Sequence, residues 1–424
     1  MIQLADSLNN AGAHTESFLI YQNLEKKYLK ERLWEHLHFV KTEQADILLR
    51  QRKIESALSL LNNLLDTTKI TEEQYPDLFS FTYAKMARCY EKKGMSDEAI
   101  VFYQKAIQLG TKGRILIHYL AQSYGYLADV YNYDKADIFN AEYYYQKELS
   151  LLQLRKDTNT KAQVHNYYSL ANVYRLKSDY DQAITYCTQA MQIARATDNN
   201  LHFLEICNLL MGNIYGSKGD YHGSLDYYHT YVQLVTSHRD KNSPKLIRCY
   251  NNLALSYDKI GLKDSSLIYL EKANNIVRNS SNYNRSDEAR YFQRLAEVHQ
   301  SSYDKAIKYA HQSKSIYQSI EANNKTNLSF IFKIIAEIQV KHEVLDSALY
   351  YIQKSLLQHE TVSYNNINHT NPSLKELKNN QGLFYSLLLK AEILGKTYQS
   401  NQKTETLNAL IETYELINKL SEVY

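Results

Sequence analysis

The sequence is 424 residues long, and only 12 of these are Gly and 3 are Pro. So few turn-forming residues argue against a fold with many short strands, and we expect an all-α protein. Lys and Arg total 49 against 46 Asp and Glu, with both signs mixed along the chain. No basic stripe follows one segment, so nucleic acid is not an expected partner.

The sequence carries no signal for a membrane or for export. The start, MIQLADSLNNAG, lacks a basic segment followed by an apolar one, and no run of about 18 apolar residues occurs. We therefore expect a cytoplasmic protein without membrane contact. The four cysteines, Cys89, Cys187, Cys207 and Cys249, show no CxxC spacing, and we interpret them as reduced thiols in packed helices.

The dominant feature is an internal repeat of about 42 residues. Each unit has a small anchor residue, and the anchors are Ala45, Ala87, Ala128, Ala171, Gly212, Ala254, Ala296 and Ala336. Twelve residues after most anchors stands a second small residue: Ala57, Ala99, Ala183, Ser224, Ser266 and Ala348. One inserted residue displaces Ala141 and a two-residue deletion displaces Ala306 from this position. Three residues after five anchors stands a tyrosine: Tyr90, Tyr131, Tyr174, Tyr215 and Tyr257.

The repeat predicts a helical hairpin in each unit. Apolar residues recur at spacings of three and four, and a polar break such as LKSD or SKGD divides the unit. Small residues let two helices cross closely, and a tyrosine ring fills the adjacent groove. The first turn of the second helix is expected to carry an aspartate that favours the helix dipole: Asp97, Asp181, Asp264, Asp304 and Asp346.

In chain order, the elements fall into four parts. Residues 1–30 fit the same frame, with an anchor at Ala5 followed by Ser17 and Tyr21, and are expected to form a truncated repeat. Residues 31–357 hold eight complete repeats. A polar linker is expected over 358–373, and residues 374–424 predict a capping hairpin with helices near 374–398 and 404–421.

The pattern Leu-Ala-x-x-Tyr, then Asp-x-Ala, then Tyr-x-x-x-Ala resembles the tetratricopeptide repeat, in a variety with longer helices than usual. The resemblance covers residues 31–357. It implies a right-handed α-solenoid in which the first helix of each hairpin lines a concave surface that binds a peptide or a partner protein. The expected function is therefore that of a non-catalytic interaction scaffold or sensor arm that regulates an attached or associated effector.

The C-terminal hairpin is similar to the segment that follows tetratricopeptide arrays in bacterial proteins ending in a caspase-like CHAT peptidase domain. The sequence ends where such a domain would begin, and the catalytic His and Cys of that family belong to the domain itself. Under this alternative the chain is the regulatory arm of a protease and carries no catalytic residue. A further alternative is a peptide-pheromone receptor that regulates transcription, although the first 30 residues are too short for the usual output domain.

Candidate binding residues are the first-helix positions expected to face the concave surface, six and three residues before the anchor and one and four after it. They are His165, Tyr168, Asn172, Arg175, Asn213, Arg248, Asn251, Asp258, Arg290, Gln293 and Glu297. We expect the asparagines to bond to the backbone of an extended peptide and the arginines to bind a carboxylate. Asparagine just after the anchor is a position that the family often uses in this way. The alternative is that a solvated groove is simply polar.

Other kinds of site are not expected. Cys207 and Cys249 stand five residues before their anchors on neighbouring helices, where packing is a simpler role than a redox switch. The 14 histidines include no HExxH motif and no pair four residues apart, so we expect no metal site. No glycine-rich phosphate loop or nucleophile elbow occurs, so we expect neither a cofactor nor catalytic residues.

Overall fold

The computed structural model describes residues 1–113, 117–154, 160–196, 201–280, 282–320, 325–358, 371 and 381–421. In these ranges every regular element is helical and there is no strand, which confirms the all-α prediction. No helix in the same ranges is both long enough and apolar enough to cross a membrane. The chain divides into two compact units, Met1–Asp198 and Asn199–Tyr424, and each is described by itself.

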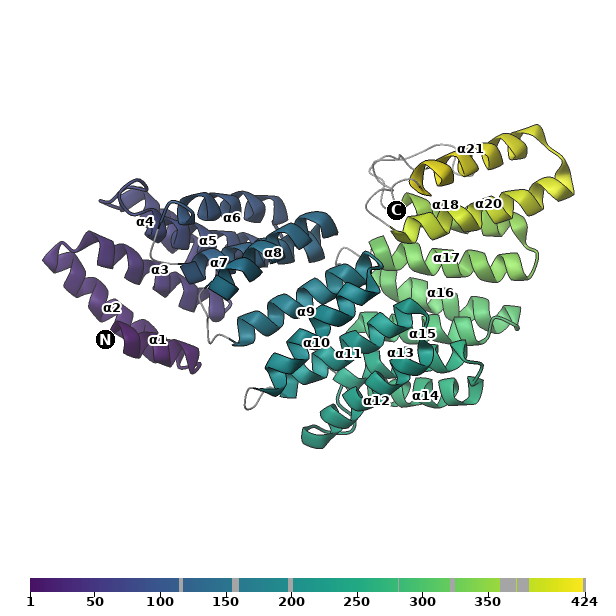
Figure 1. Ribbon diagram of the computed structural model, residues 1–424, viewed down its shortest axis with the longest axis horizontal. Coiled ribbons are helices and arrows are strands. Elements are labelled where there is room, and N and C mark those ends of the chain that lie inside the picture. The colour runs from purple at the N-terminus through teal and green to yellow at the C-terminus, as the bar shows by residue number, and fades with distance from the viewer. Residues whose placement is uncertain are drawn as a thin grey trace. The chain divides into compact units, whose positions relative to one another are not determined.

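The first unit consists of helices that pack as consecutive antiparallel hairpins (Figure 1). Its hairpins are α1 (Ile2–Asn10) with α2 (His14–Glu31), α3 (Trp34–Arg50) with α4 (Ile54–Thr67), α5 (Pro76–Lys92) with α6 (Ser96–Gly110), α7 (Ile117–Asp129) with α8 (Ile138–Leu154), and α9 (Thr160–Leu176) with α10 (Tyr180–Arg195). A π-helical turn, η1 (Val130–Asp134), follows α7 directly.

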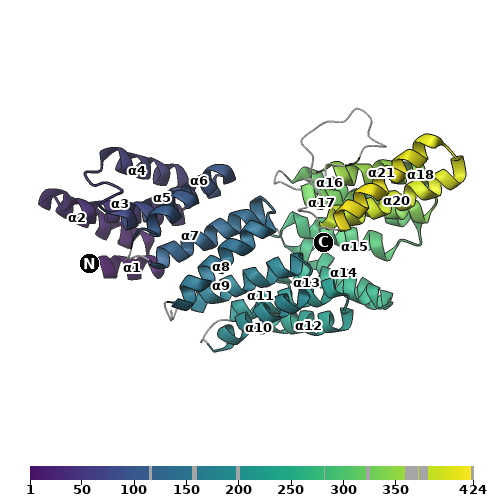
Figure 2. The same cartoon turned by 45° about the horizontal axis from the view of Figure 1, so that its top comes forward.

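The second unit, taken by itself, also consists of consecutive antiparallel hairpins (Figure 1, Figure 2). Its hairpins are α11 (Leu201–Lys218) with α12 (Tyr221–His238), α13 (Lys245–Lys259) with α14 (Lys263–Asn279), α15 (Arg285–Val298) with α16 (Tyr303–Ser319), α17 (Lys325–Lys341) with α18 (Leu345–Leu357), and α20 (Gln381–Asn401) with α21 (Thr404–Ser421).

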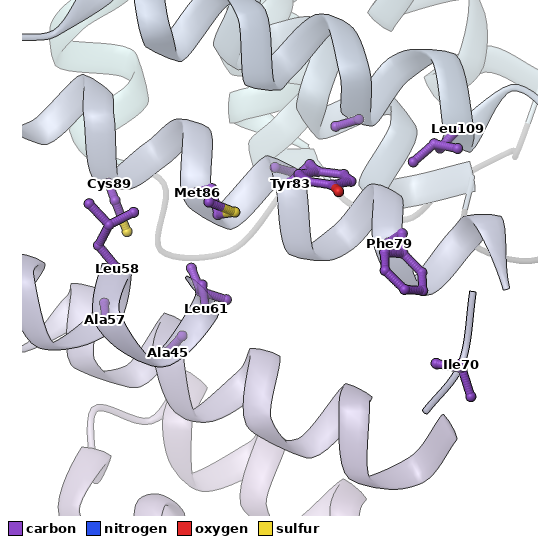
Figure 3. Packing of buried hydrophobic residues seen from close by; sticks show 12 residues of the cluster. Ala45, Ala57, Leu58, Leu61, Ile70, Phe79, Tyr83, Met86, Cys89 and Leu109 are labelled. Atoms are coloured by element: carbon purple, nitrogen blue, oxygen red, sulfur yellow. The ribbon is translucent and has the colours of Figure 1, made fainter. Parts of the chain in front are cut away.

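The small residues of the repeat lie where the helices cross. Every anchor falls in the first helix of a hairpin and is buried, and every second small residue falls in the second helix and is buried. Gly212 shows why size matters, because a Cβ atom there would lie 2.4 Å from the ring of Tyr228 on α12. Around Ala45 and Ala57, Leu58 and Leu61 of α4 point toward α5 (Figure 3). The hairpin prediction is confirmed.

The tyrosines three residues after the anchors have a more specific partner than a groove. Each stacks on an aromatic ring of the second helix in the same hairpin, 12 or 13 residues further along the chain. The ring centroids lie 5.1 Å apart in Tyr90–Phe102, 5.5 Å in Tyr131–Tyr144, and 5.3 Å in Tyr174–Tyr186, Tyr215–Tyr227 and Tyr257–Tyr269. These stacks tie the two helices of a hairpin together near the turn that joins them.

The two irregular spacings of the repeat have local structural causes. The residue inserted before Ala141 is taken up by η1, where the Lys135 N–H donates to the Val130 carbonyl, five residues back, at 3.1 Å. The deletion before Ala306 shortens α15, which ends two residues after its anchor, whereas α13 and α17 end five residues after theirs. Ala141 and Ala306 are consequently buried like their counterparts.

At the N-terminal end the first hairpin has a short first helix, and the C-terminal end is described only in part. In α1, Ala5 is buried and its carbonyl accepts a 2.7 Å hydrogen bond from the Ser17 hydroxyl of α2. Of the expected linker 358–373, only residues 358 and 371 are described, and residues 374–380 of the expected capping helix also lie outside the described residues. The described part of that hairpin, α20 and α21, runs to Asn401 and over Thr404–Ser421. The five aspartates expected in the first turns of second helices are found there.

Candidate functional site

In the first unit, the four candidate residues lie along α9. The Arg175 guanidinium donates to the Asn172 side-chain oxygen from Nη2 at 2.9 Å and from Nε at 3.3 Å, so the amide is already held by its neighbour. His165 is exposed and lies near the partly buried carboxyl of Asp129 on α7, where it acts to lower the pKa of that carboxyl. Burial raises the pKa of Asp129, although His165 and a hydrogen bond from Tyr145 oppose this.

In the second unit, the two candidate asparagines connect helices of neighbouring hairpins. The Asn213 side-chain oxygen accepts hydrogen bonds from the Tyr228 hydroxyl and from the Asn252 amide, both at 2.9 Å. Asn251 is 0% exposed, and its amide nitrogen donates to the backbone carbonyl of Asp287 at 3.0 Å. A buried amide that is bonded to protein backbone cannot reach a ligand in this structure. Packing therefore supplies a reason for these asparagines that their sequence positions did not reveal.

The candidate arginines Arg248 and Arg290 meet at one carboxylate, Asp287, in the first turn of α15. Oδ1 of Asp287 lies 3.4 Å from Arg248 Nε and 2.9 Å from Arg290 Nη1. Burial lowers the pKa of Arg290, and the positive charges of Arg248 and Arg294 lower it further, against the effect of Tyr317 and Asp287. The structure thus brings two of the predicted arginines together on a carboxylate of the protein itself. Gln293 is buried, Glu297 pairs with Arg294 at 2.5 Å, and Asp258 is partly exposed on the last turn of α13.

A second buried carboxylate, which was not among the residues predicted from the sequence, belongs to Glu205 of α11 and is 1% exposed. Four basic side chains surround it: His238 Nε2 at 2.7 Å, Lys245 Nζ at 3.2 Å, His202 Nδ1 at 3.5 Å and Arg239 Nε at 3.6 Å. Burial raises the pKa of Glu205, but the hydrogen bond and charge of Lys245, with His202 and Arg239, outweigh burial and lower it overall. The only sequence signal was the basic run SHRDKNSPK, which spans the end of α12, the connector and the first residue of α13.

Between these two carboxylates lies a cavity of about 500 Å³ in the second unit. Its lining residues are His202, Glu205, Ile206, Leu209, Tyr231, Pro244, Lys245, Arg248, Asn282, Tyr283, Asn284 and Asp287. Arg239, Lys245, Arg248 and Arg290 contact the carboxylates of Glu205 and Asp287, which leaves two more positive than negative charges even with neutral histidines. Such an excess of donors can bind an anionic group through charge-assisted hydrogen bonds.

Among the described residues, neither the cysteines nor the potential metal-ligating side chains form a second site. All four cysteines are buried thiols. Burial raises the pKa of Cys89 to about 12 and that of Cys249 well above its ordinary value, so neither is poised as a thiolate. In the part of the chain that the structure describes, no group of three or more His, Cys, Asp or Glu side chains is placed to hold a metal ion.

Comparisons with known proteins agree with this architecture. Models of the tetratricopeptide repeat match residues 82–109, 167–201 and 247–277, which fall on the hairpins α5–α6, α9–α10 and α13–α14. No curated protein matches the sequence.

Solved structures resemble the chain over most of its length. The apo form of RapI superposes with a TM-score of 0.66 at 13% identity, covering 84% of this chain and 96% of RapI. The apo form of the quorum sensor NprR from B. thuringiensis gives 0.60 at 15% identity, covering 84% of this chain and 100% of NprR. A Rap protein complexed with Competence and Sporulation Factor gives 0.57 at 14% identity, with coverages of 84% and 96%. Identities this low establish the fold alone, but together with the repeat matches they show that the chain is a tetratricopeptide repeat protein.

Proposed function

We propose that the chain is a non-catalytic binding arm that recognises an acidic peptide, or an acidic segment of a partner protein, and thereby regulates an associated effector. The observation that carries this proposal is the excess of positive charge around the cavity between α11, α13 and α15. Guanidinium groups that already bind a carboxylate of the protein are well oriented to bind one from a ligand.

Fewer residues are proposed to contact the ligand than the sequence predicted. Arg248 and Arg290 are proposed to bind the ligand carboxylate, with Lys245 as an additional cation that the sequence analysis did not include. Asn251 is left out because it is buried, and Asn213 can contribute only its amide nitrogen because its oxygen already accepts two hydrogen bonds. In the first unit, we keep a second, separate set of residues proposed to contact the partner. They lie on α9 and are Tyr168, Arg175 and the exposed His165.

A signalling peptide is the finer ligand class that we propose. The support is the similarity of 84% of the chain to a quorum sensor and to a Rap protein complexed with Competence and Sporulation Factor. The caspase-like alternative rests on the sequence resemblance of residues 374–424 alone. It is decided by reading the gene beyond Tyr424 for a peptidase domain with a His and Cys pair.

The proposal is tested by retention of partners on the intact chain. Tagged wild-type protein, Arg248→Glu and Arg278→Glu are incubated with the same cell extract, and retained peptides and proteins are quantified by mass spectrometry. Arg278 is the matched control, because it is an exposed arginine on α14 outside the cavity. We expect the same partners on wild type and Arg278→Glu and their loss from Arg248→Glu, with unchanged far-UV circular dichroism. Equal retention by Arg248→Glu would refute the assignment of the cavity.

A further inference from the structure

One position of the first helices changes its chemistry along the second unit. Six residues before the anchor, the side chain is Arg248 in α13, Arg290 in α15 and Phe330 in α17. In α20 the equivalent anchor is Ala391, which is buried as Ala336 is, with the buried pair Ile393 and Leu394 after it. Six residues before Ala391 stands Tyr385. This row of four residues, Arg248, Arg290, Phe330 and Tyr385, is called the first-helix row below.

Three members of the first-helix row are largely exposed, and Arg290 is partly buried. The side chains of Arg248 and Arg290 are 49% and 25% exposed, and Phe330 and Tyr385 are 47% and 52% exposed. Single exposed apolar residues are ordinary on any protein surface. Two large rings at the same register position of contacting helices α17 and α20, with the exposed Leu388 one turn further on, form a patch instead.

The two rings are held together by one lysine. Lys333 Nζ lies 5.6 Å from the centre of the Phe330 ring and 5.8 Å from that of Tyr385. The same ammonium group pairs with Glu337 at 3.3 Å, so its charge is balanced within the protein. The patch is therefore apolar in net character, and its rings are positioned before any ligand arrives. Ordered aromatic side chains lose little entropy on binding, which makes them effective anchors.

We propose that the first-helix row recognises an extended peptide segment with two features: an acidic group that binds Arg248 and Arg290, and large apolar side chains that bind Phe330 and Tyr385. This inference rests on the proposed function and specifies the ligand. The distribution of charge along the row determines where each feature binds. The surplus guanidinium groups of Arg248 and Arg290 attract the carboxylate of the ligand. The aromatic patch, where Glu337 balances the charge of Lys333, accepts the apolar side chains.

The spacing of the two features follows from helix packing. Neighbouring packed helices lie about 10 Å apart, and an extended chain advances about 3.3 Å per residue. Phe330 and Tyr385 stand on helices α17 and α20, which contact each other, whereas α15, which carries Arg290, meets α17 mainly through α16. The ligand should therefore carry two large apolar residues about three positions apart, both on the same side of its acidic residue and at least about three positions from it. A helical ligand, rising 1.5 Å per residue, would need about twice as many residues for the same span.

The probe for a test is a phage-displayed library of random 12-residue peptides, selected on the intact chain. Enriched peptides are synthesised, and their dissociation constants are measured by fluorescence polarisation. The variants are Phe330→Ser with Tyr385→Ser, Arg248→Glu with Arg290→Glu, and the control Tyr350→Ser, which removes an exposed ring from the second helix α18. Circular dichroism verifies that each variant keeps its helical content.

We expect enriched peptides to combine an acidic residue with apolar residues at the stated spacing. Each double variant should weaken binding about tenfold or more, as loss of an anchor does, while Tyr350→Ser binds like wild type. Binding that is lost in the arginine variant but unchanged in the aromatic variant would overturn this inference and leave the proposed function standing. Peptides insensitive to both double variants, or a selection that enriches no peptide, would overturn both.

Discussion

Replacing Gly212 with alanine tests the idea that small anchor residues determine how the helices cross. The added Cβ would lie 2.4 Å and 2.5 Å from Cε1 and Cδ1 of Tyr228, distances that no packed structure tolerates without movement. The ring cannot move freely, because Tyr228 is buried and its hydroxyl donates to Asn213 at 2.9 Å. The substitution must therefore either displace the ring or push α11 away from α12.

Opposing effects set the magnitude of the change. Alanine is favoured over glycine in a helix interior by about 1 kcal/mol. Overpacking a core costs about 1–3 kcal/mol, and loss of the Tyr228 hydrogen bond adds about 1 kcal/mol. We therefore expect Gly212→Ala to lower the free energy of unfolding by about 1–3 kcal/mol. The clash outweighs the gain in helix propensity.

Gly216, one turn later in the same helix, is the matched control. A Cβ atom there would meet nothing closer than 3.8 Å, so Gly216→Ala should stabilise the protein by up to about 1 kcal/mol. Urea unfolding followed by circular dichroism gives the stabilities, and hydrogen exchange of α11 and α12 shows whether the effect is local. Removing the ring with Tyr228→Leu should make Gly212→Ala far less harmful in the double variant. If Gly212→Ala stabilises the protein as Gly216→Ala does, the explanation of the anchors is wrong.

Three further predictions concern buried titratable groups. Burial raises the pKa of Glu148 to about 8, so the folded state keeps a proton that the unfolded state loses, and stability falls as pH rises from about 5 to 8. Glu148→Gln should remove this fall, and at pH 8 it should be more stable than wild type by at least about 1 kcal/mol. Urea unfolding of both proteins at about pH 5 and pH 8 measures this. If the stability of the variant depends on pH as that of wild type does, the prediction is wrong. Burial alone would raise the pKa of Asp46, but the charges and hydrogen bonds of Lys85 and Arg50 lower it overall, so its contribution is present above pH ~4 and lost as pH falls further. Asp46→Asn should therefore cost about 3 kcal/mol at pH 7, and this cost should shrink progressively as pH is lowered below about 4; a cost independent of pH would show that the ion pair is not responsible. The four buried cysteines should react with a thiol reagent only after unfolding in urea, and rapid labelling of the folded protein would disprove their burial.

The sequence predicted the helical hairpins because their determinants are local and repeated. An alanine or glycine anchor, a tyrosine three residues later and a second small residue twelve later can all be recognised within one unit. The stacked partner of each tyrosine was harder to see, because Phe102, Tyr144, Tyr186, Tyr227 and Tyr269 lie on the second helix among many other tyrosines. Only the packing of the two helices shows which of these second-helix rings stacks on the tyrosine of the first helix.

Less of the candidate site could be predicted from the sequence, because most of its polar contacts join different hairpins. Arg248 and Arg290 were identified from their register, but their shared partner Asp287 was not, since the contact with Arg248 spans 39 residues. Glu205 takes its basic partners from α11, from the end of α12, from the following connector and from α13. Register on a single helix cannot tell an amide that faces a ligand from one, like Asn251, that bonds to the next hairpin.

The π-helical turn η1 has a consequence for how such arrays change over evolutionary time. A residue added inside an α-helix rotates everything beyond it by about 100°, which would turn the apolar side of α8 away from its neighbours. Because the extra residue sits in η1, at the tip of the hairpin, Ala141 stays buried and Tyr144 still stacks on Tyr131. A hairpin tip can thus hold an extra residue without changing which side of the next helix packs against its neighbours, whereas the same insertion in mid-helix would turn that side away.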